Sequence, residues 1–383
     1  MLKRIFSEDI QMGMFIVRIG GDDESSAPVP VERIMGTPEE VEAIRRAAGG
    51  TVVIDTSRGT SPEGGGTARE AVRVPFADEL VTARNIYRRA LVYMEGLFND
   101  IRFGRPFDLE GVRHFSGAIA KSTGRNARAA AGLCILRCQG FVLHHSVNVS
   151  MLASAFARHV GLGEEQVEEV AVAGLLHDLG KARIPERILN KPGKLTTEEF
   201  ARMKRHPEFG HELLIGEPSI SDPVRRAVLD HHEDCCRSGY PGGKGLEDLD
   251  AYTRILTVAD VYDALISDRP YRVGMAPNQA LTLMYQGRGR LFDVETLERF
   301  VHFIGVYPVG SFVRLEDRRY AVVAELHDDG PLHPTVFVVY DEHLRPAGRE
   351  LLRLSAGNNG DKGCGVAECL NPRDLHIDVE RFL

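Results

Sequence analysis

The spacing of apolar and polar residues changes twice along the chain, which indicates three parts of different architecture. In the first part, residues 14–19 and 51–55 favour strands, and residues 37–48 favour a short helix with proline in its first turn. Residues 57–68 are rich in Gly, Ser, Thr and Pro, the composition of a flexible connection. We therefore expect a small α+β module at 1–66, then a linker and connecting helix at 67–109.

The middle of the chain, from Phe76 to about Ile304, has apolar residues three and four positions apart, the period of helices with one buried face. Beyond Pro308 the pattern is typical of strands, expected at 311–315, 320–323 and 335–340. The predicted fold class is thus mainly α. We expect an all-helical core at 110–308, preceded by the α+β module and followed by a β-rich extension at 309–383.

Composition excludes several classes of protein. The 383 residues carry 47 Lys and Arg against 55 Asp and Glu, a net charge of −8, with 43% hydrophobic residues. This is the balance of a globular chain rather than a disordered one or a binder of nucleic acid polymers. No run approaches the roughly 18 apolar residues of a membrane span, and no secretory signal is evident, so we expect a cytoplasmic protein. Six cysteines are too few for a disulfide framework, and free thiols are expected.

Histidines and aspartates fall on helix faces that the apolar pattern buries. His145, for example, lies four positions before Val149 in an apolar series. Seven such groups, on five segments, are His145, His177, Asp178, His206, His231, His232 and Asp260. Gly180 is expected at the C-terminal turn of the helix that leads to His177.

Burying so many ionisable groups without compensation would cost several kcal/mol of lost solvation. Each histidine alone could be a hydrogen-bonded core residue, but the recurrence on separate segments favours metal ions. Seven ligands are more than one metal ion with open coordination positions can take. The set therefore predicts two ions about 3.5–4 Å apart that share a carboxylate. Histidine and aspartate without thiolate favour iron or manganese over structural zinc.

Two-metal sites of this kind are suited to phosphoester hydrolysis, because the ions activate a bridging water and stabilise the leaving oxygen. Lys181, one turn past Asp178, is placed to meet a phosphate oxygen. Arg269 and Arg272 follow the last predicted ligand and could donate two hydrogen bonds each to a second phosphate or to a guanine edge. Asp263 would accept from a base or orient these arginines.

These motifs together resemble the HD-GYP family of bacterial cyclic di-GMP phosphodiesterases, a branch of the HD metal-dependent phosphohydrolases. The resemblance covers about 140–305 and rests on His145-Ser146, His177-Asp178-Leu-Gly180-Lys181, Met203-Lys-Arg-His206-Pro, His231-His232-Glu233, Gly239-Tyr240-Pro241 and the run from Ala259 to Arg272. The first module is similar to the small N-terminal domain of unknown function that often precedes this catalytic domain.

The resemblance implies a ligand set and a reaction. One metal ion would be held by His145, His177, Asp178 and Asp260, and the second by Asp178, His206, His231 and His232. Lys181 would contact phosphate, and Asp263, Arg269 and Arg272 would contact substrate. A metal-bridging hydroxide would hydrolyse cyclic di-GMP to linear pGpG, or onward to GMP, with Asp178 and Lys181 as catalytic residues. The Gly239-Tyr240-Pro241 loop would lie near the substrate and could also dock diguanylate cyclase (GGDEF) domains.

Two positions depart from the family pattern. Phe141 stands where some members carry a glutamate for a third metal, so we expect two ions. The segment 234–237, Asp-Cys-Cys-Arg, replaces a basic residue, an aromatic, Asp or Asn, and Gly, which puts substrate affinity in question. Two other functions are weighed: hydrolysis of another cyclic dinucleotide, and a weakly active cyclic di-GMP sensor or scaffold for cyclases. The complete ligand set favours the enzyme, and the sequence leaves a homodimer open.

Overall fold

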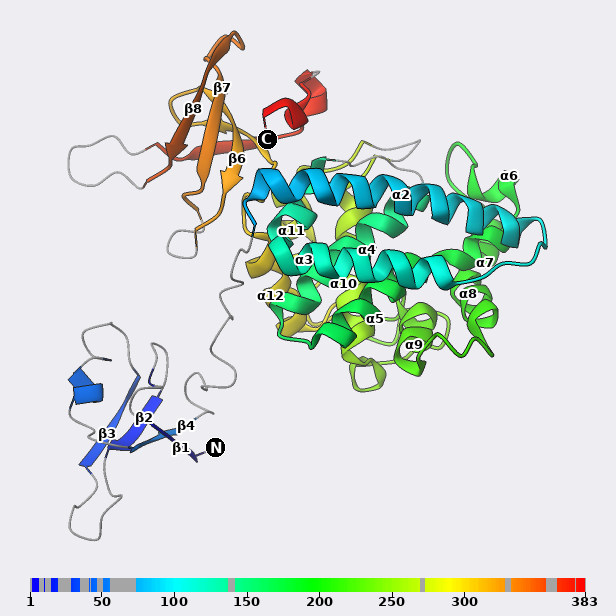
Figure 1. Ribbon diagram of the computed structural model, residues 1–383, viewed down its shortest axis with the longest axis horizontal. Coiled ribbons are helices and arrows are strands. Elements are labelled where there is room, and N and C mark those ends of the chain that lie inside the picture. Colours follow the sequence, from blue (N-terminus) through cyan, green and yellow to red (C-terminus); the bar gives the residue numbers. More distant parts are fainter. Residues whose placement is uncertain are drawn as a thin grey trace. The chain divides into compact units, whose positions relative to one another are not determined.

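The computed structural model describes residues 2–6, 10, 15–19, 29–34, 41, 43–46, 51–55, 74–136, 142–268, 273–327, 332–355, 364–375 and 377–382. The chain forms two compact units, Met1–Arg69 and Glu70–Leu383. Figure 1 shows the strands of the first unit, and the helices and second sheet of the other.

The first unit contains a four-stranded antiparallel sheet. In spatial order its strands are β1 (Leu2–Phe6), β4 (Thr51–Asp55), β2 (Phe15–Ile19) and β3 (Val29–Ile34). Val52 and Val53 of β4 are buried, as β-branched residues in a strand often are. The strands expected at 14–19 and 51–55 are confirmed, and β1 and β3 are additional. Of the helix expected at 37–48, residues 41 and 43–46 are helical, and the others lie outside the described residues.

Helices make up most of the second unit, which confirms the predicted all-helical core. They are α2 (Phe76–Arg102), α3 (Glu110–Leu136), α4 (Val142–His159), α5 (Glu164–Leu176), α6 (Glu186–Leu189), α7 (Thr197–Met203), α8 (His206–Leu214), α9 (Asp222–Asp230), α10 (Ala251–Ile266), α11 (Pro277–Gln286) and α12 (Val294–Ile304), with a short 3₁₀ helix η2 (Leu179–Arg183) after α5. Helix α4 packs against α3, α5 and α10. Its residues Val149, Leu152 and Phe156 have no exposed surface, so the apolar series that contains His145 faces the core.

Two glycines allow the elements around the histidines to approach closely. A Cβ atom on Gly174 of α5 would lie 2.4 Å from Ser150 Cα of α4. A Cβ atom on Gly180 would lie 2.0 Å from the carbonyl oxygen of His206, where η2 touches α8. The expectation that Gly180 forms a helix C-terminal turn is therefore wrong. The chain continues from α5 into η2, and Gly180 lies within η2. A glycine is required at this position because the His206 carbonyl leaves no room for a side chain.

A five-stranded antiparallel sheet follows the helices. Its spatial order is β8 (Pro346–Arg353), β7 (Thr335–Tyr340), β6 (Tyr320–Glu325), β5 (Phe312–Leu315) and β9 (Val366–Leu370). One face buries Val313, Val323 and Val336 together with Ala276, from the segment before α11. The strands expected at 311–315, 320–323 and 335–340 correspond to β5, β6 and β7, so the predicted β-rich extension is confirmed, and β8 and β9 are additional.

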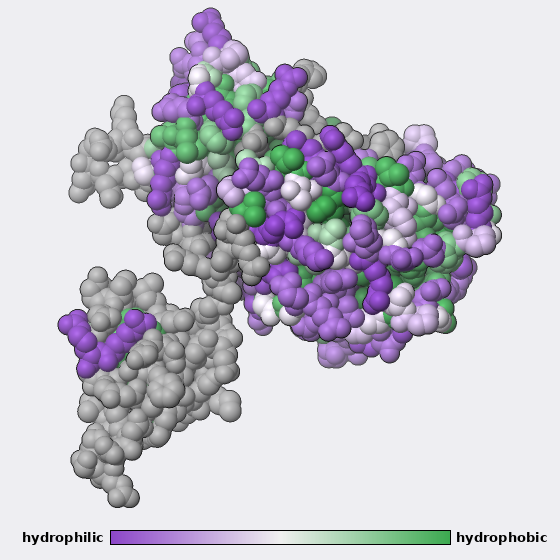
Figure 2. All heavy atoms as spheres, viewed as in Figure 1, coloured by the Kyte–Doolittle hydropathy of each residue, from purple (hydrophilic) through white to green (hydrophobic). Residues whose placement is uncertain are grey.

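The surface of the described part is mixed in character. On the face shown in Figure 2, hydrophobic residues form small patches among hydrophilic ones. Among the described residues, none of the helices has the length and apolar character that crossing a membrane requires.

Candidate metal centre

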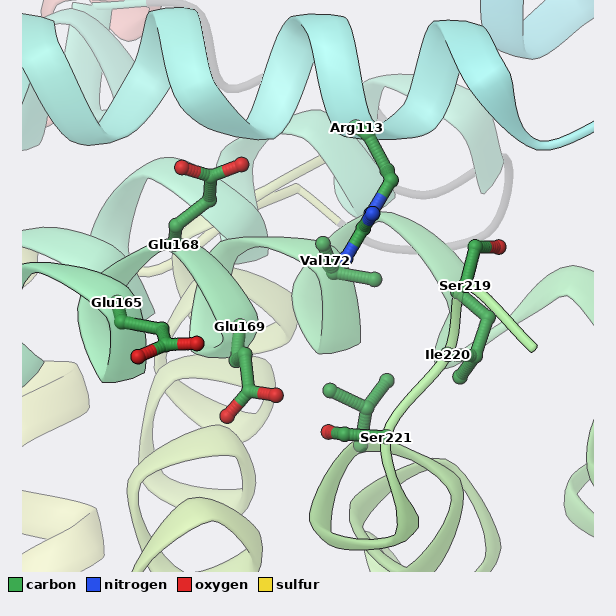
Figure 3. Close-up of a pocket in the computed structure, with 9 residues that line it drawn as sticks. Arg113, Glu165, Glu168, Glu169, Val172, Ser219, Ile220 and Ser221 are labelled. Atoms are coloured by element: carbon green, nitrogen blue, oxygen red, sulfur yellow. The ribbon is translucent and has the colours of Figure 1, made fainter.

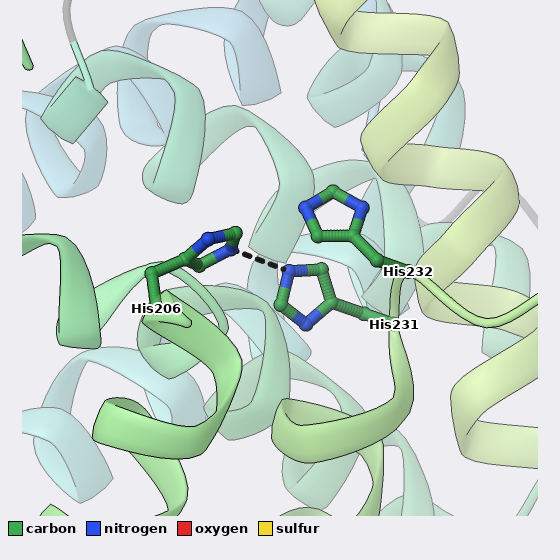
Figure 4. A group of neighbouring side chains, drawn as sticks. All are labelled: His206, His231 and His232. Carbon is green, nitrogen blue, oxygen red and sulfur yellow. Dashed lines mark hydrogen bonds between the residues drawn. The ribbon is translucent and has the colours of Figure 1, made fainter. Parts of the chain in front are cut away.

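The seven predicted ligands come from different elements and lie together in the structure. His145 belongs to α4 and Asp260 to α10. The others stand at element ends: His177 and Asp178 between α5 and η2, His206 at the first position of α8, and His231 and His232 directly after α9. Figure 4 shows the imidazoles of His206, His231 and His232 gathered between their helices.

Short distances connect the cluster from one end to the other. His145 Nε2 lies 2.8 Å from Asp260 Oδ1, and His177 Nε2 lies 3.4 Å from Asp178 Oδ2. The other oxygen of Asp178 lies 3.2 Å from His206 Nε2, which places this carboxylate between the two halves.

Three overlapping groups have ligand atoms that all lie within 4.8 Å of one another: His145, His177 and Asp260; His177, Asp178 and His231; and His206, His231 and His232. These groups have the composition and spacing to hold metal ions.

Three histidines are held in one tautomer by a backbone carbonyl of the helix that precedes them. Nδ1 lies 2.8 Å from the carbonyl oxygen three residues earlier in each of the pairs His177 and Gly174, His206 and Met203, and His231 and Val228. We assign the proton to Nδ1, which donates to the carbonyl and leaves the Nε2 lone pair directed into the cluster. Such a second contact is typical of metal-ligating histidines.

The Nε2 atoms lie where a cation would bind. Among the described residues, His177 Nε2 is buried without a hydrogen-bond partner, and the Nε2 atoms of His206 and His231 face each other at 3.2 Å. Two imidazole lone pairs at that distance repel unless a cation lies against them or one is protonated. The residues therefore fit metal ions, because a cation would satisfy all three atoms.

The electrostatics keep His206, His231 and His232 neutral and Asp178 charged. Burial lowers the pKa of His206, lowers that of His231 far below its usual range and lowers that of His232 to about 3. Burial opposes ionisation of Asp178, but Lys181 and His177 hold its pKa well below the ordinary value. These are the protonation states in which imidazole and carboxylate bind metal.

His145 differs from the other histidines because both of its nitrogens face carboxylates. Burial alone would lower its pKa, but hydrogen bonds to Asp260 and Asp263 raise the pKa to about 9. Metal binding at Nε2 would replace the proton that this nitrogen shares with Asp260.

Lys181 lies at the edge of the cluster. Its Nζ donates to Asp178 Oδ2 at 2.5 Å, and 15% of its side chain is exposed. It is thus within reach both of the central carboxylate and of a molecule that enters from solvent.

Asp263 lies enclosed beside His145 in the structure. Its side chain has no exposed surface, and its oxygens accept from His145 Nδ1 at 2.7 Å and Asn148 Nδ2 at 2.8 Å. A carboxylate enclosed in this way faces His145 and Asn148, and its predicted contact with substrate stays a prediction. Sequence reasoning missed Asn148, although its spacing of three from His145 places the two on one helix face.

Arg269 and Arg272 lie outside the described residues, between Asp268 and Val273. The described ends of this segment approach each other, since Gly274 N donates to Asp268 Oδ1 at 2.9 Å.

The Gly239-Tyr240-Pro241 loop lies against His232, which follows α9. The Tyr240 ring lies 4.7 Å from the His232 ring between centroids, and Tyr240 N donates to the His232 carbonyl at 3.1 Å. Glu233 anchors the loop, because its carboxylate accepts from Gly242 N at 2.5 Å and Lys244 N at 2.9 Å. Sequence reasoning gave Glu233 no role.

The unusual segment 234–237 forms a turn around Asp234. This carboxylate accepts from the backbone N–H groups of Cys236 and Ser238, both at 2.9 Å. Burial raises the pKa of the Cys235 thiol to about 11, so this thiol is protonated and poorly reactive at neutral pH.

A separate cavity of about 310 Å³ lies between α3, α5 and the start of α9 (Figure 3). It is lined by Arg113, Glu165, Glu168, Glu169, Val172, Ser219, Ile220, Ser221 and Val224. Three glutamates would repel a phosphate, and no histidine lines the cavity, so it has different chemistry from the His/Asp cluster.

Comparison with known proteins places this geometry in a family. The family described as "HD domain" matches residues 121–296, which include all seven clustered residues, and "Domain of unknown function (DUF3391)" matches residues 2–112. A Pseudomonas aeruginosa protein named cyclic di-GMP phosphodiesterase is 34% identical over 98% of this chain and 95% of its own length.

Two further relatives are similar over a smaller share of this chain. The cyclic di-GMP phosphodiesterase response regulator of Xanthomonas campestris is 46% identical over 38% of this chain and 39% of its own. A Vibrio cholerae protein named 3'3'-cGAMP-specific phosphodiesterase 1 is 35% identical over 38% of this chain and 33% of its own. Because the similarity to the Pseudomonas protein extends over nearly all of both chains, this chain belongs to the HD-GYP family of cyclic di-GMP phosphodiesterases.

Proposed function

We propose that this chain hydrolyses cyclic di-GMP at the His/Asp cluster, with two divalent metal ions, iron or manganese, as cofactors. The observation that carries the proposal is the set of imidazole Nε2 atoms fixed by Nδ1 contacts and directed toward Asp178. The name of the Pseudomonas relative supports the choice of substrate.

The two ions would share Asp178. One would be held by His145, His177, Asp178 and Asp260, and the other by Asp178, His206, His231 and His232, in agreement with the spacing of the three ligand groups. When bound, such ions lower the pKa of a water molecule and neutralise the charge that develops on the leaving oxygen.

The chain's own residues would bind and orient the phosphodiester. Lys181 pairs with Asp178 in the structure. Once Asp178 binds the metal ions, the ammonium group of Lys181 would be available to a non-bridging phosphate oxygen. Arg269 and Arg272 supply the remaining positive charge for a dinucleotide, as the family resemblance implies. Water adds to phosphorus, the P–O bond to the ribose 3' oxygen breaks, that oxygen takes the proton, and linear pGpG results.

The test is turnover by the full chain loaded with Mn²⁺ or Fe²⁺ under reducing conditions. We expect conversion of cyclic di-GMP to pGpG, which chromatography can monitor. The turnover rate of Asp178→Ala should fall by at least about a thousandfold, because both ions would lose a shared ligand. Absence of turnover by the loaded wild-type chain contradicts the proposal. Cyclic di-GMP binding without turnover would point instead to a sensor or a scaffold for cyclase domains docked at the Tyr240 loop.

A second substrate is worth the same assay, because one relative is named a 3'3'-cGAMP-specific phosphodiesterase. We expect cyclic di-GMP to give the higher kcat/KM. A larger value for 3'3'-cGAMP would keep the reaction class and replace the substrate.

A further inference from the structure

We propose that Asp263, supported by Asn148 and Ser267, is a positioning residue that holds His145 in its ligating tautomer and thereby sets the affinity of one metal site. The inference rests on the proposed function of the His/Asp cluster and extends it to three residues that are not ligands.

Asp263 has its oxygens occupied by fixed donors. Oδ2 lies 2.7 Å from His145 Nδ1 and 3.3 Å from Ser267 Oγ, and Oδ1 accepts from Asn148 Nδ2 at 2.8 Å. The exposed fractions are 7% for His145, 3% for Ser267 and zero for Asp263 and Asn148. The direction of the carboxylate is therefore set by α4 and the end of α10.

This arrangement distinguishes His145 from His177, His206 and His231. Those three donate Nδ1–H to a backbone carbonyl, whereas His145 donates to a carboxylate. A charged acceptor makes the stronger hydrogen bond and increases the basicity of the ligating nitrogen. Loss of Asp263 would free the His145 ring to rotate and let its proton move to Nε2, the atom needed for the metal.

Asn148 also offers a way to separate this role from general folding. Its Oδ1 is buried and has no hydrogen-bond partner in the described part of the chain. In Asp263→Asn, a flip of the Asn148 amide would present that oxygen to the new side-chain NH₂, and the new carbonyl oxygen would still accept from His145 Nδ1. The conservative variant should thus fold and keep the tautomer, with a neutral acceptor.

The test is Mn²⁺ binding by the full chain after chelator treatment, with free Mn²⁺ measured by electron paramagnetic resonance. We expect two classes of site in the wild type, and a weakening of one class by about 10–100-fold in Asp263→Ala. Asp263→Asn should recover most of that affinity. Ser154→Ala is the matched control, since Ser154 is a buried polar residue of α4 that contacts Thr123 at 3.2 Å; it should bind as the wild type does.

The inference is overturned if a folded Asp263→Ala chain, checked by circular dichroism, binds Mn²⁺ like the wild type or loses both classes equally. Should that variant not fold, Asn148→Ala gives the same test, with a smaller loss expected in one class only. Selective loss of one class in a chain that does not cleave cyclic di-GMP would uphold this inference and reject the proposed function. A wild-type chain that binds neither Mn²⁺ nor Fe²⁺ rejects both.

Discussion

Four histidines of the centre, which we propose as metal ligands, are each held in place by a second residue. The carbonyl oxygens of Gly174, Met203 and Val228 direct three imidazoles, and Asp263 directs a fourth. Lys181 is different because its partner, Asp178, is itself an expected ligand. The lysine can therefore be removed without removing a ligand atom.

Lys181→Met should lower kcat by about 10²–10³-fold, the usual effect of losing one charge-stabilising donor. The number of Mn²⁺ ions bound per chain should not change, since no ligand is lost. Steady-state kinetics and metal analysis of the same preparation test this. Lys191→Met is the control, because Lys191 pairs with Glu199 and is not a ligand. A Lys181→Met chain that turns over normally would remove Lys181 from the proposed mechanism.

Helix ends, rather than helix faces alone, assemble the site. His177, His206 and His231 stand where α5, α8 and α9 end or begin, and α4 and α10 contribute side chains from within the helix. Ends of several helices can meet only where backbones approach closely, which Gly174 and Gly180 permit.

Gly180→Ala should destabilise the chain by about 1–3 kcal/mol, because the new methyl group would overlap the His206 carbonyl and force η2 away from α8. The same movement separates Asp178 from His206, so Mn²⁺ affinity should fall as well. Urea denaturation and Mn²⁺ titration measure the two effects.

Gly96→Ala provides the control within α2, where no described atom outside the neighbouring backbone of α2 lies within 4 Å of the added Cβ atom. It should stabilise the chain by about 0.5–1 kcal/mol, since alanine favours a helix interior. If Gly180→Ala were as harmless as Gly96→Ala, the close contact would not support the site.

The two sheets of the molecule belong to different units. Met1–Arg69 is compact by itself, whereas the C-terminal sheet belongs to the same unit as the helices. Arg128 of α3 donates to the Leu326 carbonyl at 2.9 Å, and Asn371 donates to the Gly274 carbonyl at 3.2 Å. Ala276 is buried in the core of the sheet.

Removal of residues 309–383 should therefore lower the melting temperature of the helical unit, because apolar surface that the sheet covers would meet water. Removal of residues 1–69 should leave that temperature and the number of bound Mn²⁺ ions unchanged. Differential scanning calorimetry of the two truncated chains and the full chain makes the comparison. The reverse order of melting temperatures would contradict this division.

Much of the fold could be predicted because its signals are local. The three- and four-residue period placed His145 and its neighbours on a buried helix face, and alternation placed β5, β6 and β7. Strand β8 escaped prediction since its sequence, PAGRELLR, does not alternate and most of its residues are exposed. Such a strand exists because β7 supplies its hydrogen bonds, which is a non-local contact.

The sequence by itself determined the helical class of the core, the residue types of the centre and the family. Those depend on periods and ordered motifs that neighbouring residues carry. Only the tertiary structure decided that Asp263 is enclosed and faces His145, that Gly180 lies against the His206 carbonyl of α8, and that Glu233 anchors the Tyr240 loop. Each of these depends on which distant backbone or side chain comes within hydrogen-bonding or van der Waals distance, and packing of the helices sets that.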